Sequence, residues 1–169
     1  MQQYFEKRGE PERFICPQLP PSPSEAFALA SQLVSHYSAD AFAVVGSSLG
    51  GFYATAIAEA TGCRAVLLNP AVWPARDLAK YIGEQTAWHS DDRFFFQPAF
   101  IDELQALSVE RITQPERYLL LAATGDEVLD WREMTARYDG ATQRVIEGSD
   151  HGLSDFEQYI DEVVSFCER

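Results

Sequence analysis

Residues 41–62 read AFAVVGSSLGGFYATAIAEATG and carry most of the information about the architecture. The run AFAVVG is continuously apolar, which is typical of a strand buried on both faces of a parallel sheet. The alanine-rich run FYATAIAEATG has the composition of a helix, and Gly62 is a typical helix stop. The sequence therefore predicts a strand joined directly to a helix by the glycine-rich turn GSSLGG at 46–51.

Similar apolar runs recur on both sides of this unit. Strands are predicted at AVLL (65–68), YLLLAAT (118–124) and QRVIEG (143–148), and an earlier one at RFIC (13–16), where the loop PQLPPSP ends it. Strands that alternate with helices at this spacing predict an α/β fold with a mostly parallel sheet flanked by helices. Such sheets carry their sites at the carboxyl ends of the strands.

Capping boxes mark the start of two helices. Ser22 and Glu25 flank a proline, and apolar residues then recur at helical spacing, which predicts a helix over 23–37. Ser154 and Glu157 predict the start of a final helix. The apolar face expected for that helix consists of Phe156, Ile160, Val163, Val164 and Cys167.

Length and composition favour a single domain over residues 1–169, with 46% hydrophobic and 23% charged residues. Residues 71–115 interrupt the alternation as an irregular insertion, before a helix expected around IDELQAL (101–107). This insertion is either a minimal cap over a site or a connection that packs on the sheet. Its aromatic residues are Trp73, Trp88, Phe94, Phe95 and Phe96.

The charge balance excludes several kinds of partner. Lys and Arg number 13 and Asp and Glu number 26, so the formal net charge of −13 repels phosphate backbones and anionic headgroups. We therefore expect neither nucleic acid nor a membrane as a partner. No secretion signal or membrane span is recognisable, and the cytoplasm is the default location. Cys16, Cys63 and Cys167 lack the spacing of a disulfide framework or a zinc site and are expected to be buried thiols.

The turn at 46–50 matches Gly-x-Ser-x-Gly, the nucleophile elbow of α/β hydrolases, in which a serine sits on a strained strand-to-helix turn. Ser48 is the nucleophile of this motif, and we expect side chains at Gly46 and Gly50 to clash. The backbone N–H of Leu49 is the expected oxyanion donor. A turn that binds a phosphate is the alternative, but the sequence lacks the Gly-x-Gly-x-x-Gly and Gly-Lys-Ser/Thr patterns that support it.

A serine hydroxyl needs a base to remove its proton, and the base needs a third group to orient it. In this fold the chain order is serine, acid, histidine. His151 follows the last predicted strand in the loop EGSDHGLSD and is the expected base. His36 and His89 are expected to be surface or packing residues.

The acid is expected directly after the preceding strand, in ATGDEVLDW. Asp126 and Asp130 are both candidates. Asp126 is preferred because it lies nearer the strand end, while Asp130 is expected in the first turn of the next helix, where a carboxylate stabilises the helix dipole. Asp150 is disfavoured because neighbouring residues rarely direct their side chains at each other.

The motifs VVGSSLGGFYAT, LLNPAVWP, RYLLLAATGDEVLD and GSDHGL resemble the YqiA-type esterases, small bacterial α/β hydrolases with little or no cap domain. The resemblance extends from about residue 12 to the C-terminus. It implies that Ser48 is the nucleophile, Asp126 the acid and His151 the base. It also implies that short acyl esters, or acyl thioesters, are hydrolysed as small-molecule substrates without a cofactor or metal.

The resemblance also implies a strand and a His-Gly-Phe-like loop ahead of RFIC, whose backbone supplies a second oxyanion donor. The 169 residues do not contain this segment. We therefore expect weak or absent esterase activity from them, and a large gain when about 20 upstream residues are supplied, because one oxyanion donor is worth about 10²- to 10³-fold in rate. The alternatives to an esterase are a thioesterase acting on an acyl carrier and a non-catalytic relative that uses the pocket for binding.

Overall fold

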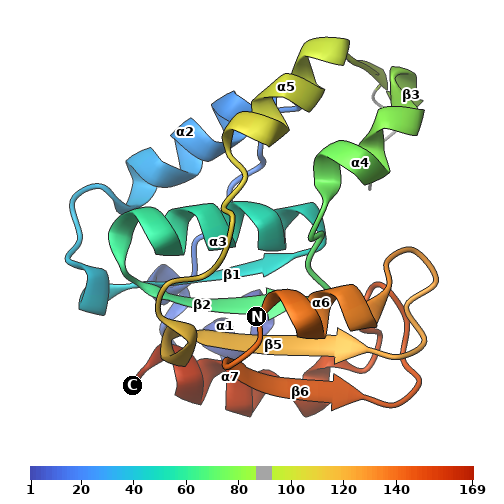
Figure 1. Ribbon diagram of the computed structural model, residues 1–169. Helices are drawn as coiled ribbons and strands as arrows, with labels where there is room; N and C mark the ends of the chain where they lie inside the picture. Colours follow the sequence, from blue (N-terminus) through green and yellow to red (C-terminus); the bar gives the residue numbers. More distant parts are fainter. Residues whose placement is uncertain (87–92) are drawn as a thin grey trace.

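A four-stranded parallel sheet forms the centre of the computed structural model, which describes residues 1–86 and 93–169 (Figure 1). Its strand order is β1-β2-β5-β6, and every neighbouring pair is parallel. The prediction of an α/β fold with a mostly parallel sheet is confirmed. The strands are β1 (Ala43–Ser47), β2 (Arg64–Leu68), β5 (Tyr118–Ala123) and β6 (Thr142–Ile146).

Helices cover both faces of this sheet, which explains why β2 and β5 are apolar without alternation. Alternate residues of β2 point to opposite faces, so Leu67 packs on the side of α3 while Val66 packs on the side of α7. Figure 1 shows α3 and α6 on one face and α1 and α7 on the other. These helices are α1 (Gln2–Lys7), α3 (Leu49–Thr61), α6 (Trp131–Arg137) and α7 (Ile160–Cys167).

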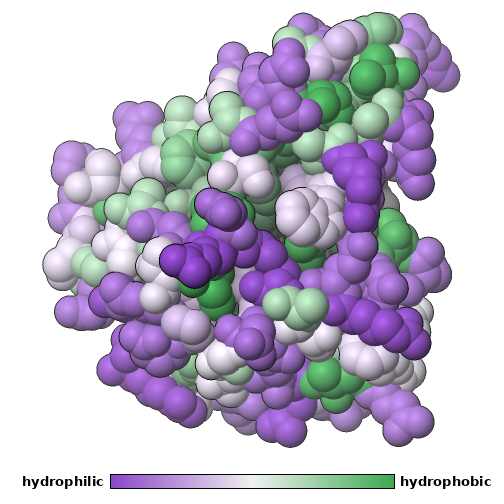
Figure 2. Space-filling model, viewed as in Figure 1, coloured by the Kyte–Doolittle hydropathy of each residue, from purple (hydrophilic) through white to green (hydrophobic). Residues whose placement is uncertain are grey.

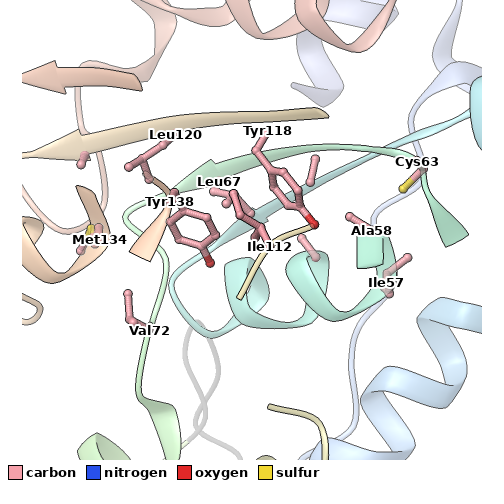
Figure 3. Packing of buried hydrophobic residues seen from close by; sticks show 13 residues of the cluster. Ile57, Ala58, Cys63, Leu67, Val72, Ile112, Tyr118, Leu120, Met134 and Tyr138 are labelled. Carbon is pink, nitrogen blue, oxygen red and sulfur yellow. The ribbon is translucent and has the colours of Figure 1, made fainter. Parts of the chain in front are cut away.

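The core between α3, α6 and the sheet contains two buried tyrosines (Figure 3). The Tyr138 hydroxyl shares a 2.8 Å hydrogen bond with Thr55, and the Tyr118 hydroxyl donates to a Glu59 carboxylate oxygen at 2.6 Å. Burial raises the pKa of both phenols, so they remain neutral donors. Their polar ends are therefore satisfied while the rings fill the core.

A second layer of helices lies beyond α3. The Ser22 hydroxyl accepts a hydrogen bond from the Glu25 N–H at 3.3 Å, so the first predicted helix begins as expected, although it ends at Val34. This layer contains α2 (Pro23–Val34), α4 (Pro74–Leu78), α5 (Pro98–Ala106) and the antiparallel strands β3 (Gly83–Thr86) and β4 (Arg93–Phe96). Short 3₁₀ helices span Pro11–Arg13, Ala39–Ala41, Ala79–Tyr81, Pro115–Arg117 and Phe156–Gln158.

The insertion packs largely on helices. Phe96 and Phe100 are buried in a cluster that includes Phe52 and Tyr53 of α3, while Phe95 is exposed. Figure 2 shows hydrophilic residues over most of the face seen in Figure 1, with hydrophobic residues between α5 and β3 and in smaller separate areas elsewhere. Trp73 is about half exposed. Trp88, His89 and the side chain of Phe94 lie outside the described residues.

The strand predicted at RFIC is wrong. Residues 14–22 have no regular structure, and within the described residues β1 pairs only with β2. One apolar residue of this run, Phe14, packs against α1 instead, where its ring stacks on Phe5 with 6.2 Å between the ring centroids. Cys16, expected to be buried, is exposed, whereas Cys63 is buried and Cys167 partly buried.

The start predicted for the last helix is also wrong. The Ser154 hydroxyl donates to the Asp150 carboxylate and does not cap a helix, and the chain passes through a 3₁₀ turn before α7 begins at Ile160. Within residues 1–86 and 93–169, no helix combines the length and the apolar character required to span a bilayer.

Candidate active site

Ser48 occupies a sharp turn between β1, which ends at Ser47, and α3, which begins at Leu49. Its backbone has φ 53° and ψ −121°, a conformation that is strained for a residue with a side chain. Two backbone hydrogen bonds tie the strained residue to the chain around the end of β2: the Ser48 N–H donates to the Leu68 carbonyl at 3.0 Å, and the Ala71 N–H donates to the Ser48 carbonyl at 2.9 Å. A third, from the Gly51 N–H to the Ser48 carbonyl at 3.0 Å, lies within the turn itself. The sharp strand-to-helix turn expected at Ser48 is therefore present, and the last residue of β2 and the segment after it hold this turn in place.

The two motif glycines differ in their surroundings. A Cβ at Gly46 would lie 2.1 Å from the Gly50 carbonyl oxygen, which is a backbone atom. A Cβ at Gly50 would have no atom within 4 Å. The expected clash is confirmed at Gly46 and wrong at Gly50, where the side chain would point into open space.

We expect Gly46→Ala to destabilise the protein by about 1–3 kcal/mol or more, because a fixed backbone oxygen occupies the space of the new methyl group. Gly50→Ala is the matched control, and it should be neutral or stabilising by up to about 1 kcal/mol, since alanine is favoured over glycine inside a helix. Urea unfolding followed by circular dichroism measures both changes. Equal stabilities of the two variants would contradict the packing described for the turn.

The structure brings the serine, the histidine and the first acidic candidate into contact. His151 Nε2 lies 3.0 Å from the Ser48 hydroxyl oxygen, and His151 Nδ1 lies 2.8 Å from Asp126 Oδ2. With the Nδ1 proton donated to the carboxylate, the Nε2 lone pair faces the serine hydroxyl, which is the arrangement of a general base. The His151 and Asp126 side chains are 10% and 0% exposed, so little water competes for these bonds.

Asp126 is held in place from its other side. Its Oδ1 accepts hydrogen bonds from the Val128 and Leu129 N–H groups, both at 2.8 Å, which leaves Oδ2 for the imidazole. Asp130 instead caps α6, where its carboxylate accepts the Arg132 N–H at 2.9 Å. Among the described carboxylates, Asp126 is therefore the one that contacts the His151 ring.

Asp150 and the other histidines are arranged differently. The Asp150 carboxylate accepts hydrogen bonds from the Ser154 hydroxyl and N–H, and these bonds lower its pKa. His36 is exposed in the turn after α2, and His89 lies outside the described residues. No group of three or more His, Cys, Asp or Glu side chains in the described part of the chain is arranged to hold a metal ion.

Leu49 supplies the first N–H group of α3, directly after Ser48. The first N–H groups of a helix have no partner within the helix, and they lie at the positive end of its dipole. This end of α3 is therefore suited to stabilise negative charge on an oxygen of a group that is covalently attached to the Ser48 hydroxyl oxygen.

Two further residues, Glu127 and Asn69, contact the backbone around His151, and the sequence alone did not indicate either of them. The His151 N–H donates to the Glu127 carboxylate at 3.0 Å, and the Asn69 side chain donates to the carbonyls of Asp150 and His151. Asn69 could have been noticed as a polar residue directly after the buried strand AVLL. Glu127 offered no comparable signal.

A family model described as "Uncharacterised protein family (UPF0227)" matches residues 1–168. The chain belongs to this family. The YqiA-type motifs indicate the same UPF0227 family, and the serine, acid and histidine described above all lie inside the matched region.

Solved structures resemble this UPF0227 member in fold. A candidate hydrolase from Agrobacterium vitis S4 aligns with a TM-score of 0.66 at 17% identity, over 87% of this chain and 69% of that one. An esterase domain of Rhodothermus marinus aligns with a TM-score of 0.59 at 21% identity, over 83% and 65%. Mouse alpha/beta hydrolase domain-containing protein 10 aligns with a TM-score of 0.58 at 18% identity, over 85% and 70%. The chain thus has an α/β-hydrolase-type fold and spans about two thirds of the length of these structures.

Proposed function

We propose that this protein is a serine hydrolase that cleaves carboxylic esters through an acyl-enzyme, with Ser48 as nucleophile, His151 as base and Asp126 as acid. The observation that carries the proposal is the unbroken hydrogen-bond chain from Ser48 through His151 to Asp126, at 3.0 and 2.8 Å, on a strained elbow. Nucleophile, base and orienting group in mutual contact are the general signature of this chemistry.

In the acylation step, the Ser48 oxygen attacks the ester carbonyl carbon while His151 Nε2 takes the hydroxyl proton. The Leu49 N–H stabilises the resulting oxyanion, and Asp126 stabilises the imidazolium. The tetrahedral intermediate then expels the alcohol, which receives the proton from His151. In the deacylation step, water attacks the acyl-enzyme by the same route and releases the acid.

The substrates are proposed to be short acyl esters, with acyl thioesters as a second class, because a thiol leaving group requires no additional catalytic residue. Two carboxylates beside the site, the exposed Glu127 and the partly buried Asp150, favour neutral over anionic leaving groups. The proposed site uses side chains and backbone N–H groups throughout, and no step passes through a metal or cofactor.

The second candidate function is a binding module that has kept the fold without catalysis. The three-residue hydrogen-bond chain does not favour it, since a binding surface has no need for an imidazole aligned with a strained serine. The two functions differ in one measurable property, which is the reactivity of the Ser48 hydroxyl.

The test is intact-mass analysis after incubation with a fluorophosphonate, followed by peptide mapping. We expect one adduct, on Ser48, because an aligned base and an oxyanion donor accelerate phosphonylation of this hydroxyl over the others. Heat-unfolded protein is the control and should remain unlabelled. Absence of an adduct on the folded protein would favour the binding module, and an adduct on another serine would contradict the role proposed for Ser48.

A further inference from the structure

The geometry points to Asn69 as a positioning residue that holds the loop of His151 over the sheet, and this inference rests on the proposed function. Asn69 is fully buried, with 0% exposure, although an asparagine side chain carries two donors and an acceptor. It also has φ 42°, in the left-handed region that few residues other than glycine and asparagine adopt. A buried polar residue on a strained backbone indicates a specific role for its side chain.

The sheet explains why the loop needs support. Ser48 follows β1 and His151 follows β6, and these strands lie at opposite edges of the order β1-β2-β5-β6. Three spacings of about 4.8 Å separate the two edges by about 14 Å. The imidazole nevertheless lies 3.0 Å from the serine hydroxyl, so the loop after β6 must cross the ends of β5 and β2. Asn69 stands at the end of β2, on this path.

The Asn69 side chain binds the crossing loop and the neighbouring strand together. Its Nδ2 donates to the Asp150 and His151 carbonyls, both at 3.0 Å. Its Oδ1 accepts the Ala123 N–H at 2.8 Å, three residues before Asp126. One amide therefore links the backbone of the base to the strand that carries the acid.

The residues around Asn69 hold the nucleophile in the same way. The Leu68 carbonyl accepts the Ser48 N–H, and the Ala71 N–H donates to the Ser48 carbonyl. The short segment 68–71 thus contacts the backbone of the serine, of the histidine and of the strand before the aspartate. Asn69 sets the spacing of the three side chains without touching the reacting atoms.

The experiment compares Asn69→Asp and Asn69→Gly with wild type. Aspartate keeps the shape of the side chain and its Oδ1 acceptor, but it replaces the Nδ2 donor with an oxygen that cannot donate to the two loop carbonyls. Glycine tolerates the positive φ of this position but lacks the side-chain amide altogether. Gln143→Glu is the matched control, because Gln143 Nε2 also donates to two backbone carbonyls, those of Thr135 and Tyr138, away from the catalytic loop. Each variant is assayed on p-nitrophenyl acetate at a temperature where circular dichroism shows it folded.

We expect both Asn69 variants to lose about 10- to 100-fold in kcat with KM within about twofold of wild type, since displacement of a catalytic group by about 1 Å costs this much. Gln143→Glu should keep kcat even if its melting temperature falls. Equal kcat values for wild type and both Asn69 variants would overturn the inference, as would a matching loss in Gln143→Glu.

Hydrogen exchange separates failure of this inference from failure of the proposed function. If wild type neither hydrolyses the ester nor reacts with fluorophosphonate, the proposed function fails, and exchange over residues 147–153 still tests the loop. Faster exchange there in Asn69→Gly, but not in Gln143→Glu, supports the positioning role. Unchanged exchange in both variants overturns it.

Discussion

Ser48→Ala should reduce ester hydrolysis to the background of the assay, whatever the wild-type rate, and should abolish fluorophosphonate labelling. The hydroxyl is the atom that forms the covalent bond, and no other hydroxyl is hydrogen-bonded to a histidine ring in the described part of the chain. Hydrolysis of p-nitrophenyl acetate and intact-mass analysis measure the two effects. The fold should be unchanged, because removal of this oxygen relieves no strain and leaves no buried cavity of note.

Ser47→Ala is the matched control for this substitution. Ser47 is the last residue of β1, its side chain is exposed, and it precedes the nucleophile by one position in the same motif. We expect wild-type activity and labelling from this variant. An inactive Ser47→Ala together with an active Ser48→Ala would show that the register assigned to the motif is wrong.

Asp126→Asn should lower kcat by about 10⁴-fold, because the amide cannot accept the Nδ1 proton of His151 in the same way and favours the wrong tautomer. The geometry of the site should survive, since Asn keeps an Oδ1 acceptor for the Val128 and Leu129 N–H groups. Steady-state kinetics across neutral pH measure the loss. Added chelator should change nothing in wild type or variant.

Asp130→Asn is the control for the second carboxylate in the same loop. Asp130 caps α6, and asparagine caps helices about as well as aspartate does. We expect activity and stability close to wild type. Comparable losses of kcat from Asp126→Asn and Asp130→Asn would contradict the role proposed for the hydrogen bond between Asp126 and His151.

Much of the sheet could be predicted from sequence because its strands are short apolar runs bounded by clear turns. AVLL and YLLLAAT correspond closely to β2 and β5, whose buried residues face helices on both sides. The contacts among Ser48, Asp126 and His151 followed from one topological fact, that parallel strands end on the same side of a sheet.

The wrong predictions share one physical cause: each depended on which atoms lie next to a residue in space, and the local sequence does not specify those neighbours. RFIC is apolar enough for a strand, but a strand exists only when a neighbour accepts its backbone hydrogen bonds, and no described strand does. Ser154 has the spacing of a helix cap, yet the Asp150 carboxylate competes for its hydroxyl. The motif predicts that a side chain at position 50 would clash, but a Cβ built at Gly50 has no atom within 4 Å.

The role of Asn69 could not be predicted for the same reason, because the groups that its side chain binds are distant in the sequence. The two carbonyl groups that its side chain binds lie 81 and 82 residues further along the chain. A single sequence shows only that a polar residue follows an apolar strand. The role of such a residue becomes visible when the loop that crosses it is placed in space.

The distance along the chain between Ser48 and His151, 103 residues, also has a kinetic consequence. Contacts between such remote residues form late in folding, because chain entropy must be lost before they are made. The serine can acquire its reactivity only after β1, β2, β5 and β6 have all assembled. During refolding from urea, the return of fluorophosphonate reactivity should therefore lag behind the return of helical circular dichroism. The length of this lag measures how long the loop that carries His151 takes to dock across the strand ends once the sheet has formed.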